Sequence, residues 1–225
     1  INDSIYAPVS DHRLETLLTA FGQGTIPDSA FIQRGSTTYT IDPYNQPTER
    51  FSVLRELLAT GDVARIIQVL KDSGLRGMGG AGFPTGLKWE IVRNATGSEK
   101  YVVVNADESE PRTFKDRFLM DKFPHLLIEG ILLGAYVVGA QKAYLFIRHE
   151  YPDQEHVLAK GLVEARAQGL IGTQISGTDF SCDIEIFVSA GGYICGEETA
   201  LLEALEGKRA EPRNKPPFPG THGLW

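Results

Sequence analysis

Three short strand-like runs, separated by segments of helical pattern, constrain the fold of this chain more than any other feature. Tyr101–Asn105 and Ala143–Ile147 are rich in β-branched and aromatic residues, as buried strands are, and Asp183–Val188 alternates polar with apolar residues. Helical patterns lie between them at Leu126–Gly139 and Asp153–Gln168. Alternating helices and strands predict an α/β fold with a mainly parallel sheet flanked by helices.

More helices are predicted on both sides of this alternating part. Their expected positions are Phe51–Leu58, Asp62–Asp72, Leu87–Arg93 and Glu197–Glu206, with Thr113–Met120 leading into the helix near Leu126. Residues 1–50 are rich in polar residues, glycine and proline, with one short helical candidate at Asp11–Phe21, and they predict an extended arm. We therefore expect an N-terminal arm over residues 1–50 and an α/β domain over residues 51–225.

The charge and cysteine content exclude several functional classes. With 225 residues, a formal net charge of −7 and a pI near 5.3, the chain lacks the basic field that attracts nucleic acid. Glu129 and several glycines interrupt the longest apolar run, so no direct membrane insertion is expected. Cys182 and Cys195 lack CxxC spacing and cannot alone form a zinc or iron–sulfur site, which predicts no metal site and a reducing, cytoplasmic location. The missing leader and initiator methionine suggest a processed or trimmed chain.

A glycine-dense segment, Gly74–Trp89, is the strongest functional signal. We call its first part, Gly74–Pro84, the glycine loop. Glycine allows backbone N–H groups to converge on a phosphate, and Lys88 adds a cation. The loop contains GxGxxG spacing, but that dinucleotide-binding fingerprint should follow a strand, whereas Asp62–Asp72 has a helical pattern. An ordinary Rossmann dehydrogenase is therefore disfavoured, and a phosphate-binding loop and a tight connector both remain open.

Two more loops follow predicted strands. Asn105–Pro111 carries three acids and an amide after the first strand, and Ser189–Thr199 carries glycines, a tyrosine and two glutamates after the third. Ligands of open α/β sheets gather at the carboxyl ends of strands, and a helix N-terminus offers free N–H groups. The alternatives are a solvated acidic turn for the first loop and glutamates that complement a helix dipole for the second.

A fourth segment, Lys215–Pro219, joins a cation and an aromatic ring in a proline-rich loop. Phe218 could stack on a flat ring, although a generic proline-rich connector is the stronger interpretation of this segment by itself. Taken together, the loops indicate a site for a flavin, a dinucleotide or both.

Four ordered motifs in these loops resemble one known family. They are GLRGMGGAGFPTGLKW, NADESEPRTFKDR, GGYICGEETALLEALEG and KPPFPGTHGLW, and they extend from about Ser73 to Trp225. They resemble the FMN- and NADH-binding flavoprotein subunit of respiratory complex I, a module that also occurs in NAD-reducing hydrogenases and NAD-dependent formate dehydrogenases. The resemblance implies a Rossmann-like flavin- and NADH-binding domain.

The resemblance also implies a set of flavin contacts. Residues that match the family's FMN-binding positions in the first two motifs are Gly77, Gly79, Gly80, Lys88, Asn105, Asp107 and Glu108. Of these, the last three match the residues that contact the ribityl and phosphate region. The second wall of the flavin and nicotinamide site is matched by Tyr193, Gly196, Glu197 and Glu198.

Contacts to the nicotinamide nucleotide are implied in the same way. Phe83 matches a residue that stacks on NADH rings, and Glu110 matches an acid beside NADH. Lys215 and Phe218 match residues near the adenosine end. The implied reaction is hydride transfer between nicotinamide and flavin, so no side chain is expected to act as nucleophile or acid–base pair, and Glu110 and Glu198 support the cofactors.

The family's wider redox chain sets the expected partners. FMN would pass electrons singly to iron–sulfur clusters on other subunits of a complex, including a [2Fe–2S] thioredoxin-like subunit or domain. The family's ubiquitin-like domain and helical bundle follow this part of the subunit. The bundle's [4Fe–4S] cluster is expected in the complete subunit, and its ligands are not in this chain.

Three positions depart from the family's usual pattern. Met78 stands where complex I subunits usually carry arginine, and Ser109 and Arg112 stand where glycines are common. These departures favour a soluble relative such as a formate dehydrogenase β-subunit. The alternatives are a flavoprotein subunit of complex I or of a hydrogenase, and a degenerate docking subunit that no longer turns over.

Overall fold

The computed structural model of the chain describes residues 15, 18–20, 23, 41–97 and 99–225. The chain divides into two units, residues 1–43 and residues 44–225. In the first unit the described residues include one helical turn, in which the Gln23 N–H donates to the Thr19 carbonyl at 3.1 Å. Most of the predicted helix Asp11–Phe21 and of the predicted arm lies outside the described residues. All elements below belong to the second unit.

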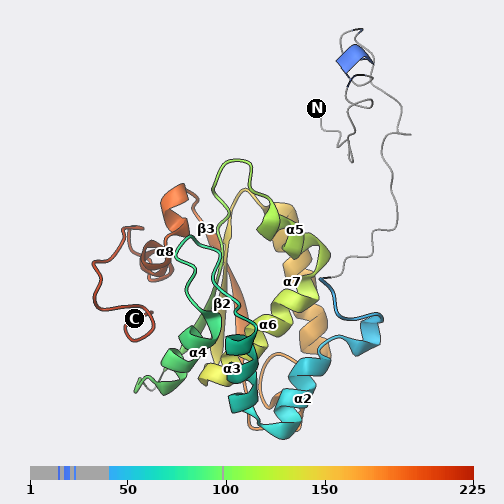
Figure 1. Ribbon diagram of the computed structural model, residues 1–225, viewed down its shortest axis with the longest axis vertical. Coiled ribbons are helices and arrows are strands. Elements are labelled where there is room, and N and C mark those ends of the chain that lie inside the picture. Colours follow the sequence, from blue (N-terminus) through green and yellow to red (C-terminus); the bar gives the residue numbers. More distant parts are fainter. Residues whose placement is uncertain (1–14, 16–17, 21–22, 24–40, 98) are drawn as a thin grey trace. The chain divides into compact units, whose positions relative to one another are not determined.

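A parallel sheet of three strands forms the centre of the second unit (Figure 1). Strands β1 (Tyr101–Ala106), β2 (Lys142–Arg148) and β3 (Asp183–Ser189) lie in the order β1-β2-β3. The predicted parallel α/β fold is thus confirmed. The prediction that Tyr101–Asn105 is a buried strand was wrong, because β1 is half-buried to exposed up to Asn105. It lies at an edge of the sheet, and edge position is not encoded in the local sequence pattern.

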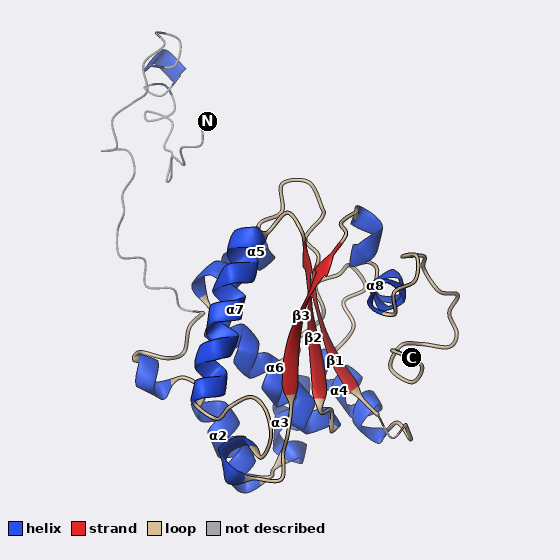
Figure 2. Ribbon diagram, turned by 180° about the vertical axis from the view of Figure 1, so that it is seen from behind, coloured by secondary structure: helices blue, strands red, loops and turns tan. Residues whose placement is uncertain are grey.

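Helices cover the two faces of the sheet unequally (Figure 2). The elements α5 (Lys115–Lys122), α6 (Pro124–Val138) and α7 (Pro152–Ala167) pack on one face, and the short α8 (Glu198–Leu205) packs on the other. Side chains alternate along a strand, so Ala143, Leu145 and Ile147 of β2 enter the larger core while Tyr144 and Phe146 enter the smaller one. This division leaves the α8 side thin and close to the surface.

Three further helices, α2 (Ser52–Thr60), α3 (Val63–Asp72) and α4 (Thr85–Asn94), pack near α6. Glu129 of α6 is buried and accepts hydrogen bonds from the Leu54 N–H at 3.1 Å and the Tyr44 hydroxyl at 2.7 Å. The carboxylate thereby satisfies a free amide at the start of α2. Tyr44 and its neighbours therefore belong to the second unit.

The remaining elements are short 3₁₀ turns: η2 (Pro47–Glu49), η3 (Ile175–Gly177) and η4 (Tyr193–Gly196). Every predicted helix and strand in the second unit begins and ends within two residues of the observed first and last residues. Glu197, predicted as the first residue of a helix, is instead the N-cap of α8. No helix in the described part of the chain has both the length and the apolar character needed to cross a membrane.

Candidate functional site

The carboxyl ends of the strands bring the loops after β1 and β3 into contact. The Asn105 side-chain amide donates to the Gly196 carbonyl at 2.8 Å, and its oxygen accepts from the Asp107 N–H at 3.1 Å. Asn105 is the next-to-last residue of β1 and Gly196 ends η4, so one amide side chain joins two segments that are 91 residues apart. This contact unites two of the predicted site segments.

The glycine loop is closed at its base and open at its tip. The Gly77 N–H donates to the Phe83 carbonyl and the Thr85 N–H to the Leu75 carbonyl, both at 2.9 Å. Gly80 has a φ of 95°, which side-chain-bearing residues rarely adopt. None of the backbone N–H groups of residues 78–82 donates to another described residue. The tip therefore presents free amide donors, as an anion-binding loop requires.

An ionic network connects four more of the predicted site residues: Lys88, Glu197, Glu198 and Lys215. The Lys215 ammonium lies 2.8 Å from Glu198 and 3.0 Å from Glu197, and the Lys88 ammonium lies 3.8 Å from the other Glu198 oxygen. The hydrogen bond to Glu198, together with that to Glu197, raises the pKa of Lys215. Lys88 of α4, the start of α8 and the C-terminal loop thus meet at Glu198.

Glu197 has a capping role at the start of α8. Its carboxylate accepts from the Thr199 N–H at 2.8 Å, the Ala200 N–H at 2.9 Å and the Thr199 hydroxyl. Burial alone would raise the pKa of Glu197, but these hydrogen bonds and the one from Lys215 outweigh it and lower the pKa to about 2. The carboxylate is therefore ionised at neutral pH, and it complements the helix N-terminus.

Asp107 carries an acceptor that no described residue satisfies. Its Oδ1 atom accepts a short hydrogen bond from the Ser109 hydroxyl, whereas Oδ2 is buried without a hydrogen-bond partner in the described part of the chain. Burial raises the pKa of Asp107. A buried polar atom without a partner is costly and rare, so this oxygen is suited to accept a hydroxyl or N–H from a ligand.

Glu108 has a different environment from its neighbours. Its buried carboxylate accepts from the Asp116 N–H at 2.8 Å, the Arg117 N–H at 3.2 Å and the Tyr151 hydroxyl at 3.0 Å. Both oxygens are thus bound to the protein itself, at the start of α5. Glu108 supports the loop, and its predicted role as a flavin contact stays a prediction.

The predicted aromatic contacts lie at the surface. Phe83, Tyr193 and Phe218 are exposed, and the Tyr193 hydroxyl donates to Glu110 at 3.4 Å. Phe218 has no described contact with the ionic network, and its predicted role stays a prediction. Met78 is 82% exposed at the tip of the glycine loop, and nothing in the structure explains its presence there.

The structure describes the backbone or contacts of the other two departures. Arg112 has a φ of 70°, the left-handed conformation that glycine adopts without strain, so the backbone fits the family's glycine and does not explain the arginine. Ser109 bonds to Asp107, as described above.

Sequence reasoning missed several supporting residues. Arg148 ends β2, Tyr151 follows it, and both contact Glu108. Arg213 connects the C-terminal loop to α8 through Glu203 and Glu206. The position of Arg148 and Tyr151 at the end of the central strand and just after it was an available signal. Nothing local distinguished Arg213 from other surface arginines.

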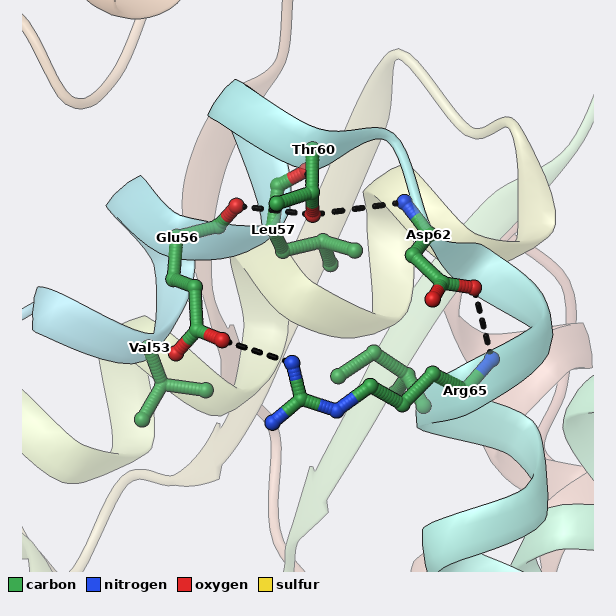
Figure 3. A pocket seen from close by; sticks show the side chains of 7 residues that line it. Val53, Glu56, Leu57, Thr60, Asp62 and Arg65 are labelled. Carbon is green, nitrogen blue, oxygen red and sulfur yellow. Dashed lines mark hydrogen bonds and ion pairs between the residues drawn. The ribbon is translucent and has the colours of Figure 1, made fainter.

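A small hollow lies far from these loops, between α2 and α3 at the other end of the sheet (Figure 3). It measures about 40 Å³, and the ion pair between Arg65 and Glu56 at 2.6 Å crosses its rim. A volume of this size holds about one or two waters, so it does not fit a nucleotide.

The fold and these loops define a class: an α/β domain with a nucleotide-type binding site at the carboxyl ends of parallel strands. Residues 70–224 match the family described as the Nuo51 FMN-binding domain. The chain belongs to this family, and the predicted resemblance is confirmed.

Known relatives agree with this assignment. The chain is 50% identical over 175 residues to the NADH-quinone oxidoreductase F 2 subunit of Rhizobium meliloti, covering 78% of this chain and 42% of the relative. It is 49% identical over 161 residues to the NADH-quinone oxidoreductase F subunit of Escherichia coli, covering 71% of this chain and 36% of the relative. A solved NAD+-reducing [NiFe]-hydrogenase in the H2-reduced state has 34% identity and a TM-score of 0.65, covering 96% of this chain and 37% of that chain. The chain thus spans about two fifths of these relatives' length.

Proposed function

We propose that this chain is the NAD(H)- and FMN-binding part of a multi-subunit oxidoreductase in which hydride passes between NAD(H) and FMN. The family match and the names of the relatives support this function. The observation that carries it is the meeting of four separate segments at Asn105, Gly196 and Glu198. No formate dehydrogenase is among the relatives described above, and the particular complex stays a proposal.

The residues present fit a flavin mononucleotide. The glycine-loop amides and Lys88 supply donors for a phosphate, and the unpartnered Asp107 Oδ2 supplies an acceptor for a ribityl hydroxyl. Such a set of donors and acceptors matches a phosphorylated polyol better than it matches a metal, since no cluster of three or more metal-ligating side chains occurs among the described residues. When bound, FMN would supply the hydride acceptor for NADH.

In this proposal the protein orients and neutralises rather than reacts. Lys88 and the loop amides hold phosphate charge, Asn105 fixes the loop that carries Asp107, and Glu197 holds the start of α8. Phe83, an exposed residue of the glycine loop, offers a ring on which the nicotinamide nucleotide can stack. Glu110 and Glu198 place negative charge beside the reacting rings.

We further propose that the parent protein works beside other subunits of a redox complex, as the names of the relatives indicate. Iron–sulfur clusters on those subunits, including a [2Fe–2S] thioredoxin-like subunit or domain, would receive the electrons. The [4Fe–4S] cluster is proposed for the part of the subunit beyond this chain.

The test uses the complete subunit that contains this chain. After reconstitution with FMN it should show flavin absorbance that bleaches on adding NADH. Lys88→Met should weaken FMN binding by about ten-fold or more, because a charged hydrogen bond contributes roughly 1.5–3 kcal/mol. Lys160→Met, an exposed lysine on α7, is the matched control. A colourless subunit that gains no flavin would overturn the proposal and favour a docking role.

A further inference from the structure

The end of the central strand β2 and the turn after it, residues 148–151, touch both site loops. On one side the Arg148 guanidinium donates to the Glu108 carbonyl at 2.5 Å, and the Tyr151 hydroxyl donates to the Glu108 carboxylate at 3.0 Å. On the other side the His149 ring lies so close to Gly191 that a Cβ there would be 2.5 Å from it. None of these residues was predicted to contact a cofactor, yet they border the two loops that contain predicted site residues.

The Arg148 side chain is held in one orientation. Its Nε and Nη2 atoms donate to the two Glu150 oxygens at 2.9 and 2.6 Å, and its guanidinium lies 5.4 Å from the centre of the Tyr151 ring. The side chain is only 19% exposed. A guanidinium fixed by a bidentate carboxylate and a ring has little freedom left, so its third nitrogen, Nη1, points steadily at the Glu108 carbonyl.

Among the described residues, no other side chain donates to a main-chain carbonyl of residues 107–110. The described hydrogen bonds that tie the main chain of residues 107–110 to the sheet come from Asn105 and Arg148. Within the loop itself, the Thr113 N–H donates to the Glu110 carbonyl and the Ser109 hydroxyl to Asp107. These local bonds shape the loop. The Glu108 carboxylate anchors the side chain of this residue to α5 and Tyr151, and Arg148 holds its main-chain carbonyl.

We propose that Arg148 is a positioning residue for the cofactor site: its hydrogen bond to the Glu108 carbonyl holds Asp107 and Glu110 in place for the ligand. The identity of the ligand rests on the proposed function, and the hydrogen bond is an observation of the structure. Arg148 would touch no cofactor and would act through the loop. Glu150 orients Arg148, and the Tyr151 hydroxyl makes a second hydrogen bond to Glu108, at its carboxylate.

Two variants and one matched control test this role in the complete subunit. Arg148→Met removes the guanidinium N–H donors with little change in side-chain volume. Arg148→Lys keeps the positive charge but loses the planar guanidinium that bonds to Glu150 and the Glu108 carbonyl at the same time. Arg166→Met is the control, because Arg166 also bonds to a carboxylate (Asp183, 2.8 Å) and a main-chain carbonyl (Ile184, 2.9 Å), but at the amino ends of the strands.

The first readout is hydrogen–deuterium exchange of residues 106–114 without FMN, and the second is FMN affinity. Arg148→Met should speed exchange in this segment and weaken FMN affinity by about ten-fold each, as loss of a charged hydrogen bond predicts. Arg148→Lys should recover part of both, and Arg166→Met should leave both unchanged. The lysine variant carries the comparison if the methionine variant does not fold.

Each outcome decides a separate point. Unchanged hydrogen–deuterium exchange in the Arg148 variants would refute the claim that Arg148 holds the loop. Faster exchange with wild-type FMN affinity would refute the claim that this hold matters for cofactor binding. If the wild-type subunit binds no FMN, the proposed function fails, and the exchange comparison still decides whether Arg148 holds the loop.

Discussion

The close crossing of α3 and α4 at Gly86 leads to the most quantitative prediction. These two helices flank the glycine loop, and Gly86 is buried between them. A Cβ on Gly86 would lie 2.9 Å from the Lys71 main-chain nitrogen, 2.9 Å from the Lys71 Cγ and 3.2 Å from the Ile67 carbonyl oxygen. Two of these three atoms are backbone, so the new methyl group cannot be accommodated by a side-chain rotation.

Two opposing effects determine the result of Gly86→Ala. Alanine is favoured over glycine inside a helix by about 1 kcal/mol. Against this, an overpacked methyl group costs typically 1–3 kcal/mol, and overlap with main-chain atoms places this case at the upper end, about 3 kcal/mol. We therefore expect the free energy of unfolding to fall by about 2 kcal/mol.

Gly130→Ala is the matched control. Gly130 is an exposed position of α6 where a Cβ would meet nothing within 4 Å. The same substitution should there raise the free energy of unfolding by up to about 1 kcal/mol, since the helix gain is unopposed. Urea unfolding of the chain, followed by circular dichroism, measures both. If Gly86→Ala stabilises the chain as Gly130→Ala does, the helices do not approach as closely as the structure states, and the reasoning is refuted.

Three other predictions concern buried or half-buried groups. Glu108→Ala should lower the free energy of unfolding by about 2–3 kcal/mol, because α5 loses its cap and the Tyr151 hydroxyl loses its acceptor; urea unfolding measures this, and a loss below about 0.5 kcal/mol would contradict the capping role. For Glu197 and Glu206, burial would raise the pKa, but hydrogen bonds dominate and lower each from 4.5 to about 2. Since the folded-state pKa is depressed, their contribution to stability is present above about pH 4.5 and is lost as the pH falls towards 2; thermal unfolding between pH 7 and 2 should show it, and Glu206→Gln should reduce the slope in that window. Burial raises the pKa of Cys182 to about 12, so this thiol should resist alkylation at pH 8 in the folded chain and react once the chain is unfolded, as mass spectrometry can record; rapid labelling of the folded chain would contradict its burial.

Local pattern was sufficient to predict the order and type of the elements. The period of the apolar residues distinguished helices from strands, and glycines and prolines marked their ends. Two properties of the strands and helices escaped it. Half-burial of β1 follows from its place at the edge of the sheet, and the position of Glu197 as a cap follows from bonds that form only when α8 starts one residue later.

The candidate site was predictable in composition but not in contacts. Parallel strands place their carboxyl ends at one edge of a sheet, so loops after β1 and β3 were expected to be neighbours. The sequence alone did not distinguish the buried, capping Glu108 from the exposed Glu110 two residues away. That difference depends on the amides of Asp116 and Arg117 at the start of α5 and on Tyr151, which follows a different strand.

By itself, the sequence determined the alternating helices and strands, the family and the residue types available for a cofactor, because these depend on local period, turn chemistry and motif. Tertiary structure alone decided which carboxylates accept hydrogen bonds from helix N-termini and which have an oxygen left for a ligand. It joined Asn105 to Gly196 and Lys88 to Glu198 across about a hundred residues of chain. Such contacts form only when the packing of the whole domain outweighs the entropy of closing long loops, and no local pattern records that balance.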